Sequence, residues 1–200
     1  MPGKRCLNGL IRIAAAVALL AAATASAAAP AAAQDQPAQI TPEPLMGGSS
    51  GTRVGVTCDN DRVLVGVTGK AGSWLNNLFL KCARVSGATL SDVRTMGYNY
   101  QRIGDMCGVG CQDYTVQCPS GQVVKGIMVY RGGYVNQIGL YCRGWDGTGW
   151  NGTGNLVGPK GGTGGSYDRR DCDRRTQPVV GIVARAGWWV DALGIRCDEP

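Results

Sequence analysis

The sequence has 200 residues, with 20 lysines and arginines against 14 aspartates and glutamates, and it contains no histidine. The lack of histidine removes the commonest general base and a common zinc ligand, so the composition favours neither an enzyme nor a zinc site. Glycine is abundant, with 32 residues, and short runs of Val, Ile and Leu are bounded by glycine. Such runs, without long helical periodicity beyond the first residues, predict an all-β fold.

Residues 1–33 have the pattern of an export signal. Lys4 and Arg5 form a basic start, an alanine-rich apolar run follows, and small residues then offer A-x-A cleavage patterns. The apolar run is short for a membrane span, so we expect no stable span after cleavage, a retained anchor being the alternative. Cleavage leaves 17 basic and 14 acidic residues, a balance that does not favour nucleic-acid binding. We therefore expect a secreted, periplasmic or cell-surface protein, of bacterial type.

The mature chain divides into a tail and one domain. Residues 34–46 are polar and proline-rich, which predicts a flexible tail. Residues 47–200 are enough for one domain with its own core. Eight cysteines follow the signal, and an even number in an exported chain predicts disulfides. They are Cys58, Cys82, Cys107, Cys111, Cys118, Cys142, Cys172 and Cys197.

One sequence unit occurs three times, as 58–82, 118–142 and 172–197. Each copy begins and ends with cysteine. Each contains Val-Gly-Val or a close variant, then a glycine, an aromatic residue, an Asn or Asp, and an apolar strand. The twelve residues that end at each first cysteine also align at their glycine-rich corners. The repeats thus cover about 47–100, 107–143 and 161–197, and the glycine-rich segment 144–160 is predicted to be a long surface loop.

Each copy is expected to form antiparallel strands closed by a disulfide. In the first copy, strands at 63–68 and 75–81 flank a turn at 70–74. Because eight cysteines allow many pairings, the repeat is the only guide, and it favours one disulfide within each copy. Cys107 and Cys111 occupy positions where the third copy has Gly161 and Gly165, so a short disulfide there would fix a turn that glycine otherwise permits. The pairs expected are Cys58–Cys82, Cys118–Cys142, Cys172–Cys197 and Cys107–Cys111.

Two stretches resemble a known family. PVVGIVARAGWWVDALGIRC (178–197) resembles the last hairpin of jacalin-related lectins, in which a G-x-x-x-D loop precedes Ala-Leu-Gly. VGPKGGTGGSYD (157–168) resembles their glycine-rich opening. The triplicate arrangement with paired cysteines is similar to that of vitelline-membrane outer-layer proteins. Both resemblances imply a type I β-prism over 47–197, with three four-stranded antiparallel sheets around a pseudo-threefold axis.

The resemblance to the lectins also implies a function and a site. In that family a sugar lies between a glycine-rich loop and the G-x-x-x-D loop, where a carboxylate accepts hydroxyl hydrogen bonds and glycine lets the ring approach the main chain. It implies a non-catalytic carbohydrate-binding protein without cofactor or metal, whose partner is a glycan or cell-surface polysaccharide. The main site would comprise Gly47, Gly48, Gly187, Trp188, Trp189 and Asp191.

Two weaker sites follow from the other copies. They have Asn where the third copy has Asp, and an amide keeps one acceptor but loses the charge. The second site would join Gly72, Trp74 and Asn76 to Gly108, and the third would join Gly132, Tyr134 and Asn136 to Gly161 and Gly162. Trp188 and Trp189 should point in opposite directions along a strand, and the exposed ring is the better candidate for stacking on a sugar.

Several alternatives remain open at the sequence level. Asp191, Asn76 and Asn136 could instead cap their turns, and the aromatic residues could simply pack. The same fold could serve as a structural envelope or surface protein without a sugar, or as an interaction module acting through 144–160. A single sugar site would bind with roughly millimolar affinity, so useful avidity would require a homo-oligomer or repeated sites.

Overall fold

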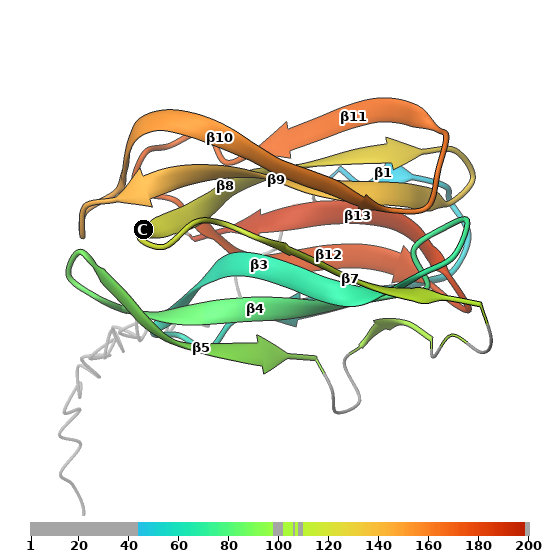
Figure 1. Cartoon of the computed structure of the whole chain (residues 1–200), viewed down its shortest axis with the longest axis horizontal. Coiled ribbons are helices and arrows are strands. Elements are labelled where there is room, and N and C mark those ends of the chain that lie inside the picture. The colour runs from blue at the N-terminus through green and yellow to red at the C-terminus, as the bar shows by residue number, and fades with distance from the viewer. Residues whose placement is uncertain (1–43, 98–101, 106, 108–109, 199–200) are drawn as a thin grey trace, which may run out of the picture. The chain divides into compact units, whose positions relative to one another are not determined.

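The computed structural model describes residues 44–97, 102–105, 107 and 110–198 (Figure 1). The predicted export signal and residues 34–43 lie outside this part of the chain. The described residues belong to one compact unit, and every element assigned in it is a strand. No helix that could cross a membrane is found among them. The strands are β1 (Met46–Gly47), β2 (Thr52–Thr57), β3 (Arg62–Ala71), β4 (Asn77–Ser86), β5 (Thr89–Met96), β6 (Ile103–Gly104), β7 (Gln112–Gln117), β8 (Gln122–Arg131), β9 (Val135–Trp145), β10 (Trp150–Gly161), β11 (Ser166–Asp171), β12 (Val179–Ala186) and β13 (Val190–Cys197).

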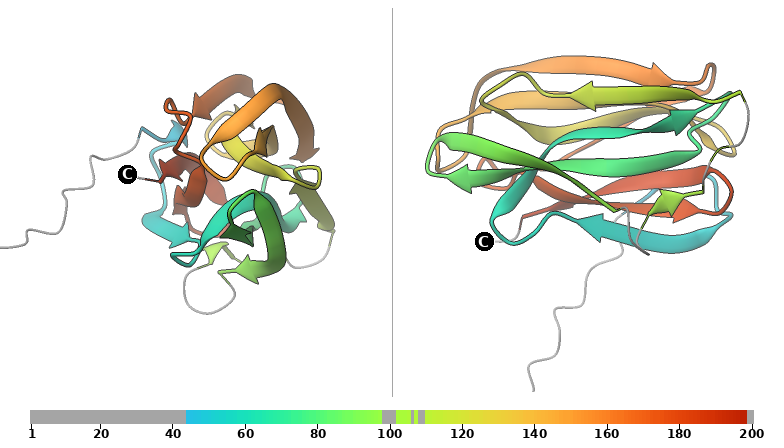
Figure 2. Two further views of the ribbon diagram at one scale, coloured as in Figure 1. Left: turned by 90° about the vertical axis from the view of Figure 1, so that its left-hand side faces the viewer. Right: turned by 60° about the horizontal axis from the view of Figure 1, so that its bottom comes forward.

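The strands form three antiparallel sheets that surround a common interior (Figures 1 and 2). Their strand orders are β1-β13-β12-β2, β5-β4-β3-β7 and β10-β9-β8-β11, and β6 pairs with β4 beside the second sheet. The first sheet combines β1 and β2 from the start of the unit with β12 and β13 from its end. The two ends of the unit are therefore joined in one sheet. The all-β fold of three antiparallel sheets predicted from the sequence is confirmed.

Each sequence repeat supplies the same central hairpin: β3–β4, β8–β9 or β12–β13. The first strand of each hairpin has a register shift of the same kind, next to the glycine of the Val-Gly-Val motif. These glycines approach the neighbouring strand closely. A Cβ on Gly66, Gly126 or Gly181 would lie 2.9, 2.5 or 2.8 Å from a carbonyl oxygen of that strand. The repeated glycine therefore lets the outer strand β7, β11 or β2 approach the hairpin at a distance where a side chain would collide with its main chain.

The interior is filled by equivalent side chains from the three hairpins. One set comprises Leu78, Ile138 and Leu193, each with an exposed fraction of 0%. A second set, from the same strands, comprises Leu80, Leu140 and Ile195. Complete burial of such a side chain contributes about 1.5–3 kcal/mol relative to exposure. Because one sheet alone would leave these faces in water, each sheet depends on the other two for its stability.

The disulfides join the cysteines that the repeat predicted. Cys58–Cys82, Cys118–Cys142 and Cys172–Cys197 have Cα–Cα distances of 5.7, 5.5 and 5.8 Å. The fourth disulfide joins Cys107 to Cys111. Each of the three long-range bonds ties the strand or turn before a central hairpin to the hairpin's second strand. In the chain-entropy model, a disulfide that closes a loop of this length stabilises the fold by about 3 kcal/mol.

Two segments differ from the sequence predictions. The predicted surface loop 144–160 is mostly strand β10, which pairs with β9. Its side chains are largely exposed and two register shifts interrupt its ladder, so it lacks the alternating pattern that marks a half-buried strand. The predicted tail also ends earlier than residue 46, because Met46 belongs to β1, pairs with Leu193 and is 1% exposed. A single buried residue beside prolines gives no periodic signal.

Candidate functional site

The three G-x-x-x-(D/N) turns are copies of one structure and lie together. In each, the N–H of the glycine donates to the carbonyl oxygen two residues later, at 3.0 Å for Gly72, 2.9 Å for Gly132 and 3.0 Å for Gly187. The turns are also bonded to one another: the Leu75 N–H donates to Val135 O (2.8 Å), and the Val190 N–H donates to Leu75 O (2.9 Å). The main chains of the three turns therefore position each other at one end of the central hairpins.

An aromatic cluster joins the same turns. The ring centroids of Trp74, Tyr134 and Trp189 lie 5.0–5.4 Å from one another in tilted and edge-on arrangements. Such pairs contribute about 0.5–1.5 kcal/mol each beyond their buried area. The geometry therefore supports the alternative in which these three rings pack against one another, and not the one in which they stack on a sugar. Trp188 differs, because it is 73% exposed. The exposed ring of the Trp188–Trp189 pair is therefore Trp188, while Trp189 is half-buried in the aromatic cluster and both residues lie in the turn before β13.

The glycine-rich segment 47–51 and the third turn converge on Asp191. The Gly48 N–H donates to Asp191 O (2.8 Å), and a Cβ on Gly51 would lie 2.5 Å from Asp191 Oδ2. Asp191 is 4% exposed, and its burial raises the pKa of the carboxyl group, against the opposing effects of its own backbone N–H and of Arg185. Gly47, Gly48, Gly187 and Asp191 are thus brought together, with the carboxylate directly beneath Gly51.

Gly48 and Gly162 show why glycine is needed at these loops. A Cβ on Gly48 would lie 2.2 Å from Gly133 O, and a Cβ on Gly162 would lie 1.9 Å from Ser73 O. Each glycine loop is therefore packed directly against the turn of a neighbouring copy. Sequence reasoning missed two contributors to the first loop, Gly51 and Arg185. Arg185 donates from Nη1 to Gly51 O (3.0 Å) and so holds the loop beside Asp191.

The two asparagine turns use their amides for backbone contacts. Asn76 Oδ1 accepts from the Gly72 N–H (3.2 Å), and Asn136 Nδ2 donates to Thr163 O (2.7 Å). Asn136 is 9% exposed, and the Gly162 N–H donates to its main-chain carbonyl oxygen (2.8 Å). A carboxylate cannot donate a hydrogen bond, so Asn136 fits this loop better than aspartate would. The capping alternative therefore describes the contact of Asn76 within its own turn, whereas Asn136 joins its turn to the glycine loop of the next copy.

A glycine that sequence reasoning did not name adjoins the second turn. Gly104, on β6, lies against Asn76, since a Cβ on it would lie 2.0 Å from Asn76 O, and the next N–H, of Asp105, donates to that oxygen (3.1 Å). The predicted Gly108 lies outside the described residues. Gly104 pairs with Asn77 as Gly47 pairs with Ala192. Gly104 precedes the segment that aligns with the other glycine-rich loops, in which Cys107 and Cys111 stand where the third copy has Gly161 and Gly165. The repeat therefore did not indicate it.

Comparison with solved structures identifies the architecture, although no family model and no curated protein matches the sequence. Frutapin, a lectin from Artocarpus incisa, is 11% identical, with a TM-score of 0.55 over 78% of this chain and 95% of that one. Single-chain recombinant jacalin is 13% identical, with a TM-score of 0.54 over 78% and 92% of the two chains. A jacalin-related lectin from Morus nigra, solved with mannose, is 12% identical, with a TM-score of 0.51 over the same shares. The fold is the jacalin-type β-prism.

The resemblance drawn from the sequence is thereby confirmed for the fold. Within the β-prism, the three turns with Trp74, Tyr134 and Trp189 form one end of the central hairpins. The predicted residues Gly47, Gly48, Gly187 and Asp191 lie at this turn end, where Asp191 meets the segment 47–51.

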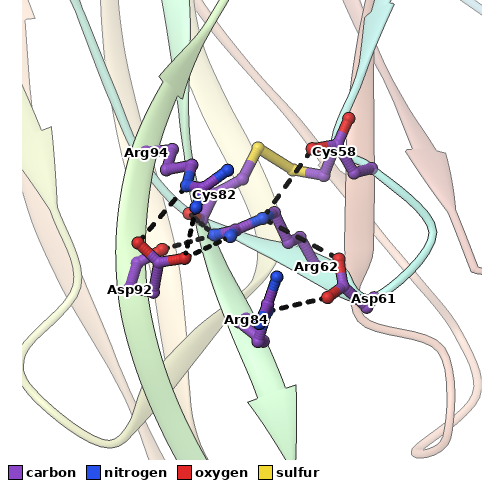
Figure 3. Close-up of polar contacts among 8 residues, drawn as sticks. Cys58, Asp61, Arg62, Cys82, Arg84, Asp92 and Arg94 are labelled. Carbon is purple, nitrogen blue, oxygen red and sulfur yellow. Dashed lines mark hydrogen bonds and ion pairs between the residues drawn. A yellow bond between two sulfur atoms is a disulfide. The ribbon is translucent and has the colours of Figure 1, made fainter.

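The other end of β3 in the β-prism carries an ionic cluster around the buried Arg62 that sequence reasoning missed (Figure 3). The Arg62 side chain is 1% exposed and donates from Nη2 to Asp92 Oδ2 (2.6 Å) and from Nη1 to Asp92 O. Asp59 and Asp61 lie 3.8 Å from its Nε. Hydrogen bonds from Arg62 and then Arg94 lower the pKa of Asp92.

This cluster joins β3 to β5 and belongs to the first copy alone. Gln122 begins β8 at the position that corresponds to Arg62, so the repeat pattern gave no hint of the cluster. Its charges are paired within the protein, which indicates a structural role.

Proposed function

We propose that this protein binds a glycan at the turn end of the β-prism, without catalysing a reaction on it. The observation that carries the proposal is the convergence of the Asp191 carboxylate and the glycine segment 47–51, at a turn that also carries the exposed Trp188 ring. A carboxylate accepts hydrogen bonds from adjacent sugar hydroxyls, and an exposed indole offers an apolar face to a pyranose ring. Glycine main chain lets the sugar approach without side-chain obstruction.

Access to the carboxylate depends on the segment 47–51. Asp191 is 4% exposed and Gly51 lies directly against its Oδ2. Ser49, Ser50 and Gly51 are themselves exposed, so this cover is at the surface. The sugar hydroxyls would take the place of Gly51 beside Asp191, while the Gly48 N–H keeps its bond to the main chain of Asp191. The proposed binding mode therefore includes a local shift of Ser49–Gly51.

The fold neighbours and the disulfides support this assignment. The Morus nigra lectin of the same fold was solved with mannose. Four disulfides are typical of proteins that work in an oxidising compartment, where glycans and cell-surface polysaccharides are the accessible partners. Because Asn76 and Asn136 are engaged with backbone groups, we assign one site per chain. A homo-oligomer would then supply the avidity that a single weak site lacks.

The test is a glycan array followed by calorimetric titration with mannose and galactose. Wild type should bind one of them with a Kd of roughly 1 mM, about −4 kcal/mol. Trp188→Ala should weaken binding at least tenfold without loss of stability, since the side chain is 73% exposed. Tyr167→Ala removes another exposed aromatic ring, on β11, and should leave binding unchanged. If Asp191→Ala binds as well as wild type, the site is wrong, and if no sugar binds saturably, the function is wrong.

A structural role is the second candidate, and the backbone contacts of the asparagines favour it. On this hypothesis the three turns exist to hold the sheets together, and the protein serves as a stable unit of an envelope or surface layer. It predicts no saturable sugar binding and concentration-dependent self-association in analytical ultracentrifugation. An interaction module acting through 144–160 would have to use strand β10, so point substitutions on its exposed face, such as Leu156→Ala, would test it in place of a deletion.

A further inference from the structure

The outer face of the β10-β9-β8-β11 sheet contains a small cavity with cationic walls. It has a volume of about 320 Å³ and is lined by Lys125 on β8, Tyr141 and Arg143 on β9, Gly154 on β10 and Arg169 on β11. The ladder between β10 and β9 shifts register between Asn151 and Asn155, beside Arg143. Bulges of this kind are frequent next to functional sites because they redirect side chains.

The cations around this cavity exceed the carboxylates. Asp171 is the carboxylate that contacts them: its Oδ2 accepts from Lys125 Nζ (3.0 Å) and Arg169 Nη2 (2.5 Å), and its Oδ1 accepts from Arg169 Nε (3.0 Å). Burial opposes its ionisation, but the hydrogen bonds from Arg169 and Lys125 prevail and lower its pKa. The three cations therefore face one carboxylate, which is already saturated by two of them.

Arg143 is the cation that the carboxylate does not neutralise. Its Nη2 donates to the carbonyl oxygen of Gly152, which is a neutral acceptor. Its Nε is shielded from solvent and has no acceptor among the described residues. A cation held against the sheet without a counter-charge keeps much of its field for a bound anion.

Aromatic contacts hold Lys125 and Arg169 in place. The Arg169 guanidinium lies over the Tyr141 ring, with its central carbon 3.4 Å from the ring centroid, and Lys125 Nζ lies 5.7 Å from the centre of the Trp150 ring. The Tyr141 hydroxyl is hydrogen-bonded to the Tyr167 hydroxyl at 3.1 Å. Stacking orients a guanidinium without cancelling its charge, so less conformational entropy is lost when an anion binds.

We propose that Lys125, Arg143 and Arg169 form a binding site for an oxyanion, namely the sulfate ester or carboxylate of an acidic sugar or a free inorganic sulfate. A guanidinium presents paired donors that match the oxygens of these groups. This site lies on the outer face of the sheet, over strands β8, β9 and β11. The proposed neutral-sugar site lies at the turns. The oxyanion site stands on its own observations and does not depend on that proposed function.

The experiment is a titration of ¹⁵N-labelled protein at constant ionic strength, read by NMR at the arginine Nε–H and backbone amide signals. The probes are sodium sulfate, galactose 6-sulfate and galacturonate, with galactose as the neutral control. Saturable shifts should appear at Arg143, Arg169 and their strand neighbours with at least one anionic probe and not with galactose. The relative affinities of the three probes then identify the source of the oxyanion. Absence of saturable shifts at these residues with all three anions overturns the proposal.

Two variants with the same loss of charge separate a site from diffuse attraction. Arg143→Gln should raise the Kd about tenfold or more, the usual effect of losing a charge-assisted hydrogen bond. Arg53→Gln removes an exposed cation from β2 in another sheet and should leave the Kd unchanged. Equal weakening by both variants would overturn the proposal. Asp191→Ala should keep anion binding intact, so failure of the sugar site and failure of the oxyanion site are distinguishable.

Discussion

The shared interior of the three sheets makes a quantitative prediction about equivalent residues. Leu78, Ile138 and Leu193 come from the second strands of the three central hairpins, and each has an exposed fraction of 0%. Replacement of each by alanine removes its buried methyl groups and leaves a cavity in the same interior. Such substitutions cost about 2–5 kcal/mol. For a domain of this size, about 3 kcal/mol corresponds to a fall in Tm of roughly 6–12 °C.

Denaturation in guanidinium chloride with the disulfides intact, followed by circular dichroism, measures these losses. The three variants should lose similar amounts of stability, because the copies contribute equally to one core. Leu156→Ala is the matched control: this side chain is 46% exposed on the edge strand β10, and its loss should cost less than about 0.5 kcal/mol. A loss below about 1 kcal/mol for one of the three buried residues, with large losses for the other two, would refute the shared core.

Two further predictions concern the covalent and steric design of the repeat. Joint replacement of Cys58 and Cys82 by serine should lower the free energy of unfolding by about 3 kcal/mol, measured by urea denaturation against wild-type protein with its disulfides intact. Gly126→Ala should destabilise by roughly 1–3 kcal/mol because the new Cβ would meet a carbonyl oxygen at 2.5 Å, whereas Gly132→Ala, with no atom within 4 Å, should be close to neutral in thermal unfolding. A neutral Gly126→Ala would contradict the close-approach explanation of the Val-Gly-Val motif.

The repeat made much of the fold predictable, because it marked the strands whose faces are buried. The hairpin β3–β4 carries short apolar runs with glycine in or beside them, as expected for buried strands, and its copies agree. The cysteine pairing followed from the same copies. The edge strands were not predictable in this way. β5 and β10 have largely exposed side chains and are held by main-chain hydrogen bonds, which place few demands on side-chain type.

The candidate site was only partly readable for a related reason. The residue types of Asp191 and Gly48 were visible in the sequence, but their exposure depends on contacts between copies. Gly51 covers the Asp191 carboxylate, and Thr163 occupies the amide of Asn136. The cations Lys125, Arg143 and Arg169 are far apart in sequence and meet only because β8, β9 and β11 are neighbours in one sheet.

Acid pH should separate the two proposed sites, because their carboxylates shift in opposite directions. The pKa of Asp191 is raised above 3.8 by burial, so its carboxylate is the first of the two to be protonated as the pH falls. Protonation removes the charge that strengthens its bonds to sugar hydroxyls, and sugar affinity should decline in this range. The Asp171 carboxyl, whose pKa is lowered below 3.8 despite its burial, remains ionised there, so sulfate binding should be unchanged.

At still lower pH the two sites should diverge further. Protonation of Asp171 releases Lys125 and Arg169 from their internal partner, while sulfate itself stays ionised, so sulfate affinity should rise. The native contacts of Asp171 also stabilise the fold above its unfolded pKa and are lost as the pH falls through its folded pKa, so circular dichroism must show that the protein is still folded. Parallel titrations of galactose or mannose and of sodium sulfate from pH 7 downwards make the comparison. If the sulfate affinity falls together with the sugar affinity while circular dichroism shows folded protein, the proposed role of Asp171 at a separate anion site is wrong.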